Sequence, residues 1–434
     1  MSYLTALFAD RHNWDMPSRP LNFFAGMCVL MLAIMGTSVS HVASTSFALL
    51  VLAGLFTMKH WKQTWIDLAK EEKWMLYGFA LYALSGFISY INVQDVSEYI
   101  KDIERYFRFL LAIPIYLFLK SYRIDVIRYL YAGVLLSGPF LLAVALYAYF
   151  ENPNMPSKGQ YHHIIFGSLA MLNVGVMLAI MLTTKLSNLS RIAISVSIFC
   201  AFTAAILSQS RGVWLAAPAY LVIVLYMIWR HSKKRAVITL LAIGLIASVA
   251  ALSPVGDIVE KRITEAIDEV TSFYKEDRYA SSVGARLAMW KIAVDVWKEN
   301  PLLGTGPGDF DDEVIALQKK GEYVGMEIHA STHNIYVQAL VNTGLVGIFI
   351  LLFSIFLQPV RMLYSSRYNN RTTSLSGLTV LLLFAVVGFS ESWILRLPMV
   401  SVYIIYILVI ASSLAVDRHV ADNNNNEVMK GSVS

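Results

Sequence analysis

Long apolar runs separated by short polar loops are the dominant pattern of this 434-residue chain. A run of about 20 apolar residues crosses about 30 Å of hydrocarbon as an α-helix. Twelve runs approach this length, so the pattern predicts an all-α integral membrane protein with about 12 transmembrane helices. The expected spans begin near Leu21, Ala43, Trp74, Tyr106, Ile127, Ile164, Ile192, Gly212, Ala236, Ile335, Leu375 and Leu397.

Composition supports a membrane protein over a soluble one. Hydrophobic residues make up 57% of the chain and charged residues 15%, whereas soluble domains carry about 25% charged residues. The net charge of +5 comes from Lys and Arg spread over the short loops, which is typical of a topology signal and not of a nucleic-acid surface. Cys28 and Cys200 both fall inside apolar spans, so we expect neither a disulfide nor a metal pair.

The basic residues of the short loops predict which side of the membrane each loop faces. One side carries 20 Lys and Arg and the other six, and the positive-inside rule places the richer side in the cytoplasm. We therefore expect a cytoplasmic N-terminus over residues 1–19, which lacks signal-peptide features and should be retained. Helices 1–9 follow over 20–253, a periplasmic loop over 254–333, helices 10–12 over 334–416, and a disordered cytoplasmic tail over 417–434.

The polar segment 254–333 is expected to contain structure of its own. Apolar residues from Ile258 to Phe273 recur at roughly helical spacing between charges, which predicts an amphipathic helix lying at a surface. A second helix is expected from about Ala285 to Lys298, because apolar and charged residues mix there and Asn300-Pro301 follows. The glycine-rich GTGPGDF that comes next predicts a turn.

Three polar residues at the rim of the apolar spans are the main candidates for chemistry. Arg211 ends the apolar run in SQSRGVW, Arg286 lies in VGARLAMW, and His333 lies in STHNIY just before the span at Ile335. A guanidinium can bind phosphate oxygens with two hydrogen bonds, and imidazole can act as a base near neutral pH. The ordinary alternatives are contact with lipid head groups for Arg211 and a helix-surface charge for Arg286.

Four further polar residues near the apolar spans are weaker candidates. Arg105 and Arg108 enter the fourth span, and Glu391 and Arg396 lie between the last two spans in GFSESWILRLP. Charge close to hydrocarbon is costly and tends to mark function. Together with the main candidates, these residues are expected to form a basic cavity containing one acid, which suits a lipid-linked diphosphate.

The sequence offers no good metal or nucleotide motif. His329 and His333 are four residues apart, but the glutamate of a zinc-protease motif is missing and Ser331-Thr332 resembles a helix start. The GTGPG run lacks the Lys-Ser/Thr of a phosphate-binding loop. His162 and His163 at the start of the sixth span are interpreted as interfacial anchors. We expect no metal and no cofactor.

The order of motifs resembles a known family. The segments SQSRGVW, GARLAMWKIAVDVWKENPLLGTGPGDF and STHNIYVQALVNTGLVGIF, which lie between Leu207 and Phe349, closely resemble the bacterial O-antigen ligases and the related polymerases. The resemblance implies a GT-C-type glycosyltransferase of the inner membrane with a periplasmic active site. Arg211 and Arg286 match family arginines that engage the diphosphate, and His333 matches the family's essential histidine. Glu391 falls where the ligases often carry Asp, so its role stays open.

The activity implied is transfer of a glycan from undecaprenyl diphosphate to the outer core of lipid A-core, without metal or nucleotide and with inversion. The partners would be the lipid-linked donor, the lipid A-core acceptor and membrane lipids, with no nucleic acid. A polymerase or a protein O-oligosaccharyltransferase would use the same donor. A polysaccharide transporter is disfavoured because we find no internal repeat, and a non-enzymatic scaffold would not require the arginine and histidine cluster.

Overall fold

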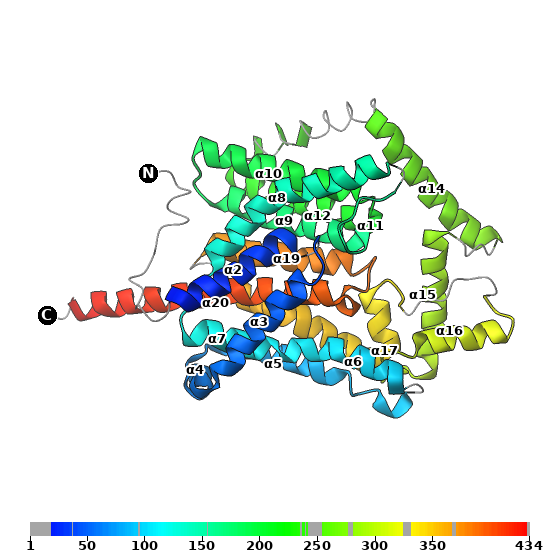
Figure 1. The fold of residues 1–434 in the computed structure, drawn as a ribbon, viewed down its shortest axis with the longest axis horizontal. Helices are drawn as coiled ribbons and strands as arrows, with labels where there is room; N and C mark the ends of the chain where they lie inside the picture. Colours follow the sequence, from blue (N-terminus) through cyan, green and yellow to red (C-terminus); the bar gives the residue numbers. More distant parts are fainter. Residues whose placement is uncertain are drawn as a thin grey trace. The chain divides into compact units, whose positions relative to one another are not determined.

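The computed structural model describes residues 19–36, 38–93, 96–153, 155–234, 237–238, 240–241, 254–276, 281–323, 331–366 and 370–431. Every regular element in these ranges is a helix, which confirms the all-α prediction for the described part of the chain (Figure 1). The chain divides into two compact units. Unit 1 comprises residues 1–85, 103–217 and 349–434, and unit 2 comprises residues 86–102 and 218–348.

Unit 1 is a bundle of apolar helices. In Figure 1 the orange-red α20 runs between α19 on one side and α3 and α7 on the other, in agreement with its packing partners. In the membrane-length part of α20, Leu397–Leu414, 89% of the residues are buried. The helices of this unit are α2 (Arg19–Met35), α3 (Val42–Phe56), η2 (Met58–His60), α4 (Trp61–Asp67), α5 (Lys70–Ser85), α7 (Ala112–Ser121), α8 (Ile127–Glu151), α9 (His163–Thr183), α10 (Asn188–Leu207), α11 (Arg211–Trp214), η4 (Leu352–Leu357, a π-helix), α18 (Gln358–Ser365), α19 (Arg371–Val387), η5 (Trp393–Leu395) and α20 (Leu397–Gly431).

Unit 2 contains the segment predicted as a long loop. Its own helices are η3 (Tyr90–Asn92), α14 (Pro254–Glu276), α15 (Ser282–Glu299) and α16 (Phe310–Lys319), while α6 (Val96–Leu110), α12 (Ala216–His231) and α17 (Ile335–Leu351) have residues in both units. The two helices predicted in this segment are confirmed as α14 and α15. They share a core with α16, in which Phe273, Ile292 and Phe310 are buried. The segment is therefore a folded part of the protein and not a linker.

Several helices are long and apolar enough to cross a membrane. Within the described residues they number six, or seven if the bent pair Val42–Phe56 and Met58–Asp67 counts as one span. The six are Ile127–Glu151, His163–Thr183, Asn188–Leu207, Arg211–Arg230, Ile335–Ser365 and Leu397–Leu414, and two shorter apolar helices cover Arg19–Met35 and Arg371–Val387. A multi-pass membrane protein is thus confirmed. The count of twelve stays a prediction, since most of the ninth expected span lies outside the described residues.

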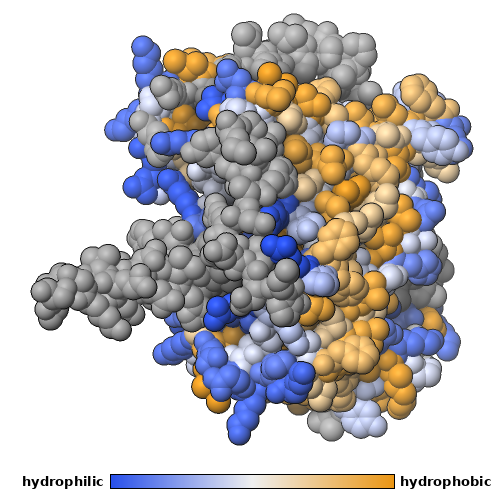
Figure 2. Space-filling view, turned by 60° about the vertical axis from the view of Figure 1, so that its left-hand side comes forward, coloured by the Kyte–Doolittle hydropathy of each residue, from blue (hydrophilic) through white to orange (hydrophobic). Residues whose placement is uncertain are grey.

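The exposed surface of the protein is consistent with a membrane protein. One face of the molecule carries a broad area of hydrophobic side chains beside hydrophilic ones (Figure 2). The exposed large apolar side chains of unit 1 include Leu52, Phe150 and Phe199. Exposed apolar area of this extent is unusual on a soluble monomer and is expected where helices contact lipid.

One sequence prediction on a helix end needs correction. The fourth expected span is interrupted at Leu111, where α6 ends and α7 begins. Helix α20 continues to Gly431, and the disorder expected for residues 417–434 stays a prediction. No proline or glycine occurs between Pro398 and Gly431, so nothing in that stretch stops a helix once the buried part has formed it.

Proline inside α8 is accommodated by a neighbouring helix. Pro139 has no backbone N–H, so the carbonyl of Leu135, four residues earlier, loses its helical partner. Ser197 Oγ of α10 donates to that carbonyl at 2.6 Å. Gly138 permits the approach, because a Cβ there would overlap the backbone of Ser197.

A buried amide joins four helices of unit 1. Asn173 Nδ2 of α9 donates to the carbonyl of Ala33 at 3.2 Å and to Ser137 Oγ at 2.6 Å, while its Oδ1 accepts from the Tyr406 hydroxyl at 2.9 Å. Each polar atom of the amide is therefore satisfied, as a polar group far from water requires. The contacts fix α9 against α2, α8 and α20.

Helix α17 is broken, which the sequence pattern did not predict. Gly344 adopts φ 64° and ψ −160° inside α17, so the tenth expected span is not continuous. Only glycine fits, because a Cβ at this position would overlap the backbone of Leu302. The loop before α16 fills the break, and the N–H groups of Leu345 and Val346 donate to the carbonyls of Pro301 and Leu302. Backbone groups freed by the break are thus satisfied inside the protein.

Candidate active site

The loop that carries Arg211 lies between α10 and α11 in unit 1. Ser208 ends α10 and is buried, and Gln209 takes a left-handed conformation with φ 53°. This sharp turn places Arg211, which is half-buried, at the first position of α11. The side chain therefore comes from a well-defined turn at a helix end and not from an open loop.

His163 holds this turn. Its Nδ1 lies 3.0 Å from the carbonyl of Ser208 and 3.0 Å from Ser210 Oγ. A carbonyl only accepts, so Nδ1 carries the proton, and Ser210 Oγ donates to the same carbonyl at 3.3 Å. The sequence interpretation of the His162–His163 pair as interfacial anchors missed this contact. The motif STHNIY drew attention to a different histidine, and nothing in the sequence links residue 163 to residue 210.

The turn of Arg211 packs against the loop of Glu391. Gly212 follows Arg211, and a Cβ at Gly212 would overlap Ser390 Oγ. Ser390 directly precedes Glu391. Two of the sequence-predicted segments, SQSRG and GFSES, are therefore brought together in unit 1, as the prediction of a shared polar site requires.

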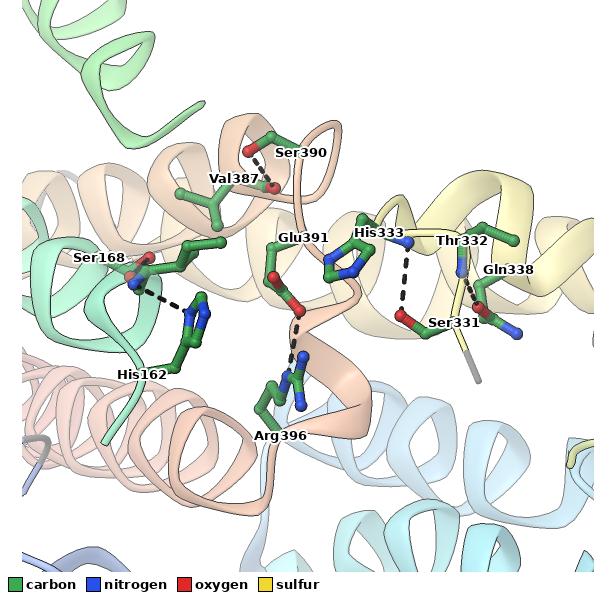
Figure 3. A network of polar contacts seen from close by, with 11 residues as sticks. His162, Ser168, Ser331, Thr332, His333, Gln338, Val387, Ser390, Glu391 and Arg396 are labelled. Carbon is green, nitrogen blue, oxygen red and sulfur yellow. Dashed lines mark hydrogen bonds and ion pairs between the residues drawn. The ribbon is translucent and has the colours of Figure 1, made fainter. Parts of the chain in front are cut away.

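Glu391 and Arg396 form an ion pair. The Arg396 Nε atom lies 3.1 Å from Glu391 Oε1 (Figure 3), and the carboxylate side chain is only 1% exposed. The nearly buried acid therefore has a fixed positive partner, which lowers the cost of its burial. Because the contact uses Nε, it does not occupy the two terminal nitrogens of Arg396. The carboxylate thus orients this arginine, which is 39% exposed.

Arg108 lies against the start of α20. Its Nη1 donates to Ser401 Oγ at 2.7 Å, and Glu104 lies 3.8 Å from its Nη2. The guanidinium also sits over the Phe47 ring of α3, 5.5 Å from the centroid. Arg105, one turn of α6 before Phe109, is half-buried. Unit 1 thus holds five of the predicted site residues, namely Arg105, Arg108, Arg211, Glu391 and Arg396.

In unit 2, the helix that carries Arg286 contacts the backbone next to His333. Arg286 lies on α15, and Trp290 follows one helical turn later on the same face. Trp290 Nε1 donates to the carbonyl of Thr332 at 2.9 Å. Thr332 precedes His333, so α15 holds the residue next to the predicted base.

The backbone of His333 has an unusual conformation that neighbouring hydrogen bonds stabilise. His333 has φ 50°, in the left-handed region that few residues other than glycine adopt. Hydrogen bonds of the preceding residue stabilise this conformation. Thr332 N donates to Gln338 Oε1 at 2.8 Å (Figure 3), and Thr332 Oγ1 donates to the carbonyl of Asn334 at 2.9 Å. Strain of this kind, about 1–3 kcal/mol, persists only where surrounding contacts impose it, and it is frequent at functional sites.

Asn334 starts the helix after the histidine. Its Oδ1 accepts from the N–H of Tyr336 at 2.9 Å and of Val337 at 3.2 Å, which is helix N-capping. The sequence placed the start at Ser331-Thr332, two to three residues early. His333 is therefore outside the helix. His329 itself lies outside the described residues.

The glycine-rich turn is anchored within unit 2. Gly304, Gly306 and Gly308 all have positive φ, which confirms the predicted turn. Ser89 Oγ donates to the carbonyl of Leu303, and Asn92 Nδ2 donates to that of Gly304 at 2.7 Å. The turn is therefore a structural support beside the break in α17. In the described part of the chain no cluster of three or more His, Cys, Asp or Glu residues is arranged to hold a metal ion.

Comparison with known proteins shows which proteins parts of the chain resemble. Residues 196–352 match the model of the family described as O-antigen ligase. The chain is 28% identical over 301 residues to an uncharacterized protein of Haemophilus influenzae, covering 68% of this chain and 73% of that protein. It is 25% identical over 217 residues to an O-antigen ligase of Escherichia coli K12, covering 48% of each chain. The chain thus spans about half the length of the second relative.

Proposed function

The chain carries the O-antigen ligase domain over residues 196–352, and from this premise we propose that it transfers a glycan from undecaprenyl diphosphate to the outer core of lipid A-core. The transfer takes place at the periplasmic face of the bacterial inner membrane. The observation that carries the proposal is that Arg211, Arg286 and His333 all lie inside the matched segment.

The transfer requires positive charge that stabilises the leaving diphosphate and a base that accepts the proton of the acceptor hydroxyl. The donor is a glycosyl diphosphate, so the leaving group departs with the electron pair of the bond to the anomeric carbon. Arg211 and Arg286 stabilise the negative charge on that diphosphate. The acceptor hydroxyl oxygen forms the new bond, and its proton passes to His333. Attack from the face opposite the leaving group inverts the anomeric centre.

The remaining charged residues have supporting roles in this proposal. Arg396 is oriented by Glu391 at 3.1 Å, and Arg108 is fixed by Ser401 at 2.7 Å, so both offer positive charge without rearrangement. Preorganised charge of this kind stabilises a developing anion better than water does. Permanently charged guanidinium groups replace a divalent metal in this scheme.

A deletion strain tests the proposal. Loss of all capped lipopolysaccharide bands together with accumulation of carrier-linked polymer supports a ligase, and purified protein should then transfer glycan from undecaprenyl diphosphate to lipid A-core. Bands capped with a single repeat would instead identify a polymerase. Unchanged lipopolysaccharide with loss of a glycosylated protein would identify a protein O-oligosaccharyltransferase.

A further inference from the structure

An apolar groove lies between α2 and α3 in unit 1. Its volume is about 560 Å³, within the range of small-ligand sites. The two helices lie side by side in Figure 1, drawn in blue. The lining is almost entirely apolar and includes Phe24, Met27 and Met31 of α2 and Leu49 of α3. Methionine side chains adapt to irregular apolar ligands.

The groove is long and has one polar end. Lining residues on α2 extend from Phe23 to Met35, a distance of about 18 Å along a helix. At the Met35 end the lining continues with Ser40 and His41 in the turn before α3. The groove therefore suits a narrow apolar chain with a polar group at the end of this turn.

The polar end is tied to the segment that leads to Arg211. Ser40 N donates to Gln160 Oε1 at 2.6 Å, and His41 N donates to the Tyr161 hydroxyl at 3.0 Å. Two residues after Tyr161, His163 contacts the turn of Arg211. Two residues of extended chain span about 7 Å. The end of the groove is thus close to the residues that hold an arginine of the proposed diphosphate site.

A second arginine lies near the same end. Arg108 sits over Phe47, which neighbours the lining residue Ser46 on α3. An apolar groove that ends near two guanidinium groups complements a molecule with an apolar chain and an anionic head.

We propose that this groove binds the first isoprene units of the donor's polyprenyl chain and directs its diphosphate toward Arg108 and Arg211. The inference rests on the proposed function, because it assumes a lipid-linked donor. It adds a specificity site for the lipid part of that donor, formed by α2 and α3, which lie outside the segment 196–352.

Chain-length dependence tests the groove. Thr45 lines it and is exposed, so Thr45→Trp should fill it. With a donor carrying the same glycan on a 55-carbon polyprenol, we expect KM to rise at least tenfold. With a donor that carries the same glycan diphosphate on a methyl group, which has no isoprene unit to enter the groove, KM should change less than twofold. Ala48→Trp is the matched control, because Ala48 is exposed on the same helix but does not line the groove.

An equal rise of KM for both donors in Thr45→Trp, or no rise for either, overturns the groove assignment. Absence of transfer from both donors by the unaltered protein would instead overturn the proposed function. These two failures are therefore distinct.

Photolabelling of the unaltered protein gives a second readout that does not depend on a variant folding. A polyprenyl diphosphate with a diazirine in its first isoprene units should label peptides of α2 or α3. Unlabelled polyprenyl diphosphate should abolish the labelling, and a hundredfold excess of phosphatidylglycerol should not. Labelling confined to other helices, or displaced by the phospholipid, assigns the groove to ordinary membrane lipid and contradicts the proposal.

Discussion

The indole Nε1 of Trp290 donates a 2.9 Å hydrogen bond to the carbonyl of Thr332, the residue before His333. Thr332 is fully buried, so this carbonyl has no access to water. The bond joins the helix of Arg286 to the segment of the proposed base. It therefore couples the position of Arg286, the proposed charge-stabilising residue, to that of His333, the proposed proton acceptor, although the two lie 47 positions apart in the sequence.

Trp290→Phe should separate this positioning from folding. Phenylalanine keeps most of the ring packing but removes the donor, and an unsatisfied buried carbonyl costs about 1–3 kcal/mol. We expect kcat to fall about tenfold or more while the protein still inserts and binds donor. Trp297→Phe is the control, because that indole bonds to Pro301 on an exposed part of α15. Equal activity of the two variants in a reconstituted assay would show that the Thr332 contact does not position the base.

Local features of the site were largely predictable from sequence, whereas long-range contacts were not. The helix expected from Ala285 to Lys298 is α15, Ser282–Glu299, because mixed apolar and charged residues end at a clear stop signal. The break at Gly344 was missed, since VNTGLVG lies inside the mostly apolar stretch predicted as the tenth span. Only the approach of the Leu302 backbone makes that glycine necessary, and no local pattern encodes it.

The same limit applies to the contacts that support the site. His163 and Ser210 meet only because α9 packs against α10. Glu391 and Arg396 were recognised as a pair of charges near the membrane, and their spacing of five residues is short enough that a loop can bring them together.

The expected topology can be checked by cysteine labelling. Cys28 and Cys200 are buried, so the background should be low. In cells with a permeabilised outer membrane, Ser282→Cys should react with an impermeant maleimide, because residues 254–333 are predicted to be periplasmic. Lys234→Cys, in the loop predicted to be cytoplasmic, should react only after the inner membrane is disrupted. The opposite pattern would reverse the orientation and remove the proposed site from the periplasm.

Arg211 and Arg286 should not be replaceable by lysine. Lysine keeps the charge but cannot make the paired hydrogen bonds of a guanidinium with phosphate. Hydrogen bonds to charged groups contribute about 1.5–3 kcal/mol, so each Arg→Lys change should lower kcat/KM by roughly 10- to 100-fold. Arg230→Lys is the control, since Arg230 is exposed at the end of α12. Full activity of both site variants would leave these arginines as ordinary contacts to lipid head groups.

His163 should act on donor binding and not on the proton-transfer step. Its Nδ1 holds Ser208 and Ser210 beside Arg211, so His163→Ala should loosen that turn and raise KM for the donor about tenfold, with a smaller change in kcat. Ser210→Ala retains the contact with the Ser208 carbonyl and should have a weaker effect. If His163→Ala and Ser210→Ala both lower kcat and leave KM for the donor unchanged, His163 does not act on donor binding.

His333 is the residue at which catalysis and backbone conformation must be separated. Its φ of 50° is unfavourable for alanine, so His333→Ala alone combines the loss of the imidazole with strain. Asparagine tolerates the left-handed region better than most residues, and its amide cannot serve as a base. His333→Asn should therefore insert normally, bind the lipid-linked donor through the arginines, and lose about 10²- to 10⁴-fold in transfer rate. If purified His333→Asn transfers glycan at a near-normal rate with donor saturating, the histidine positions the acceptor or stabilises the loop, and the proton must pass to another group.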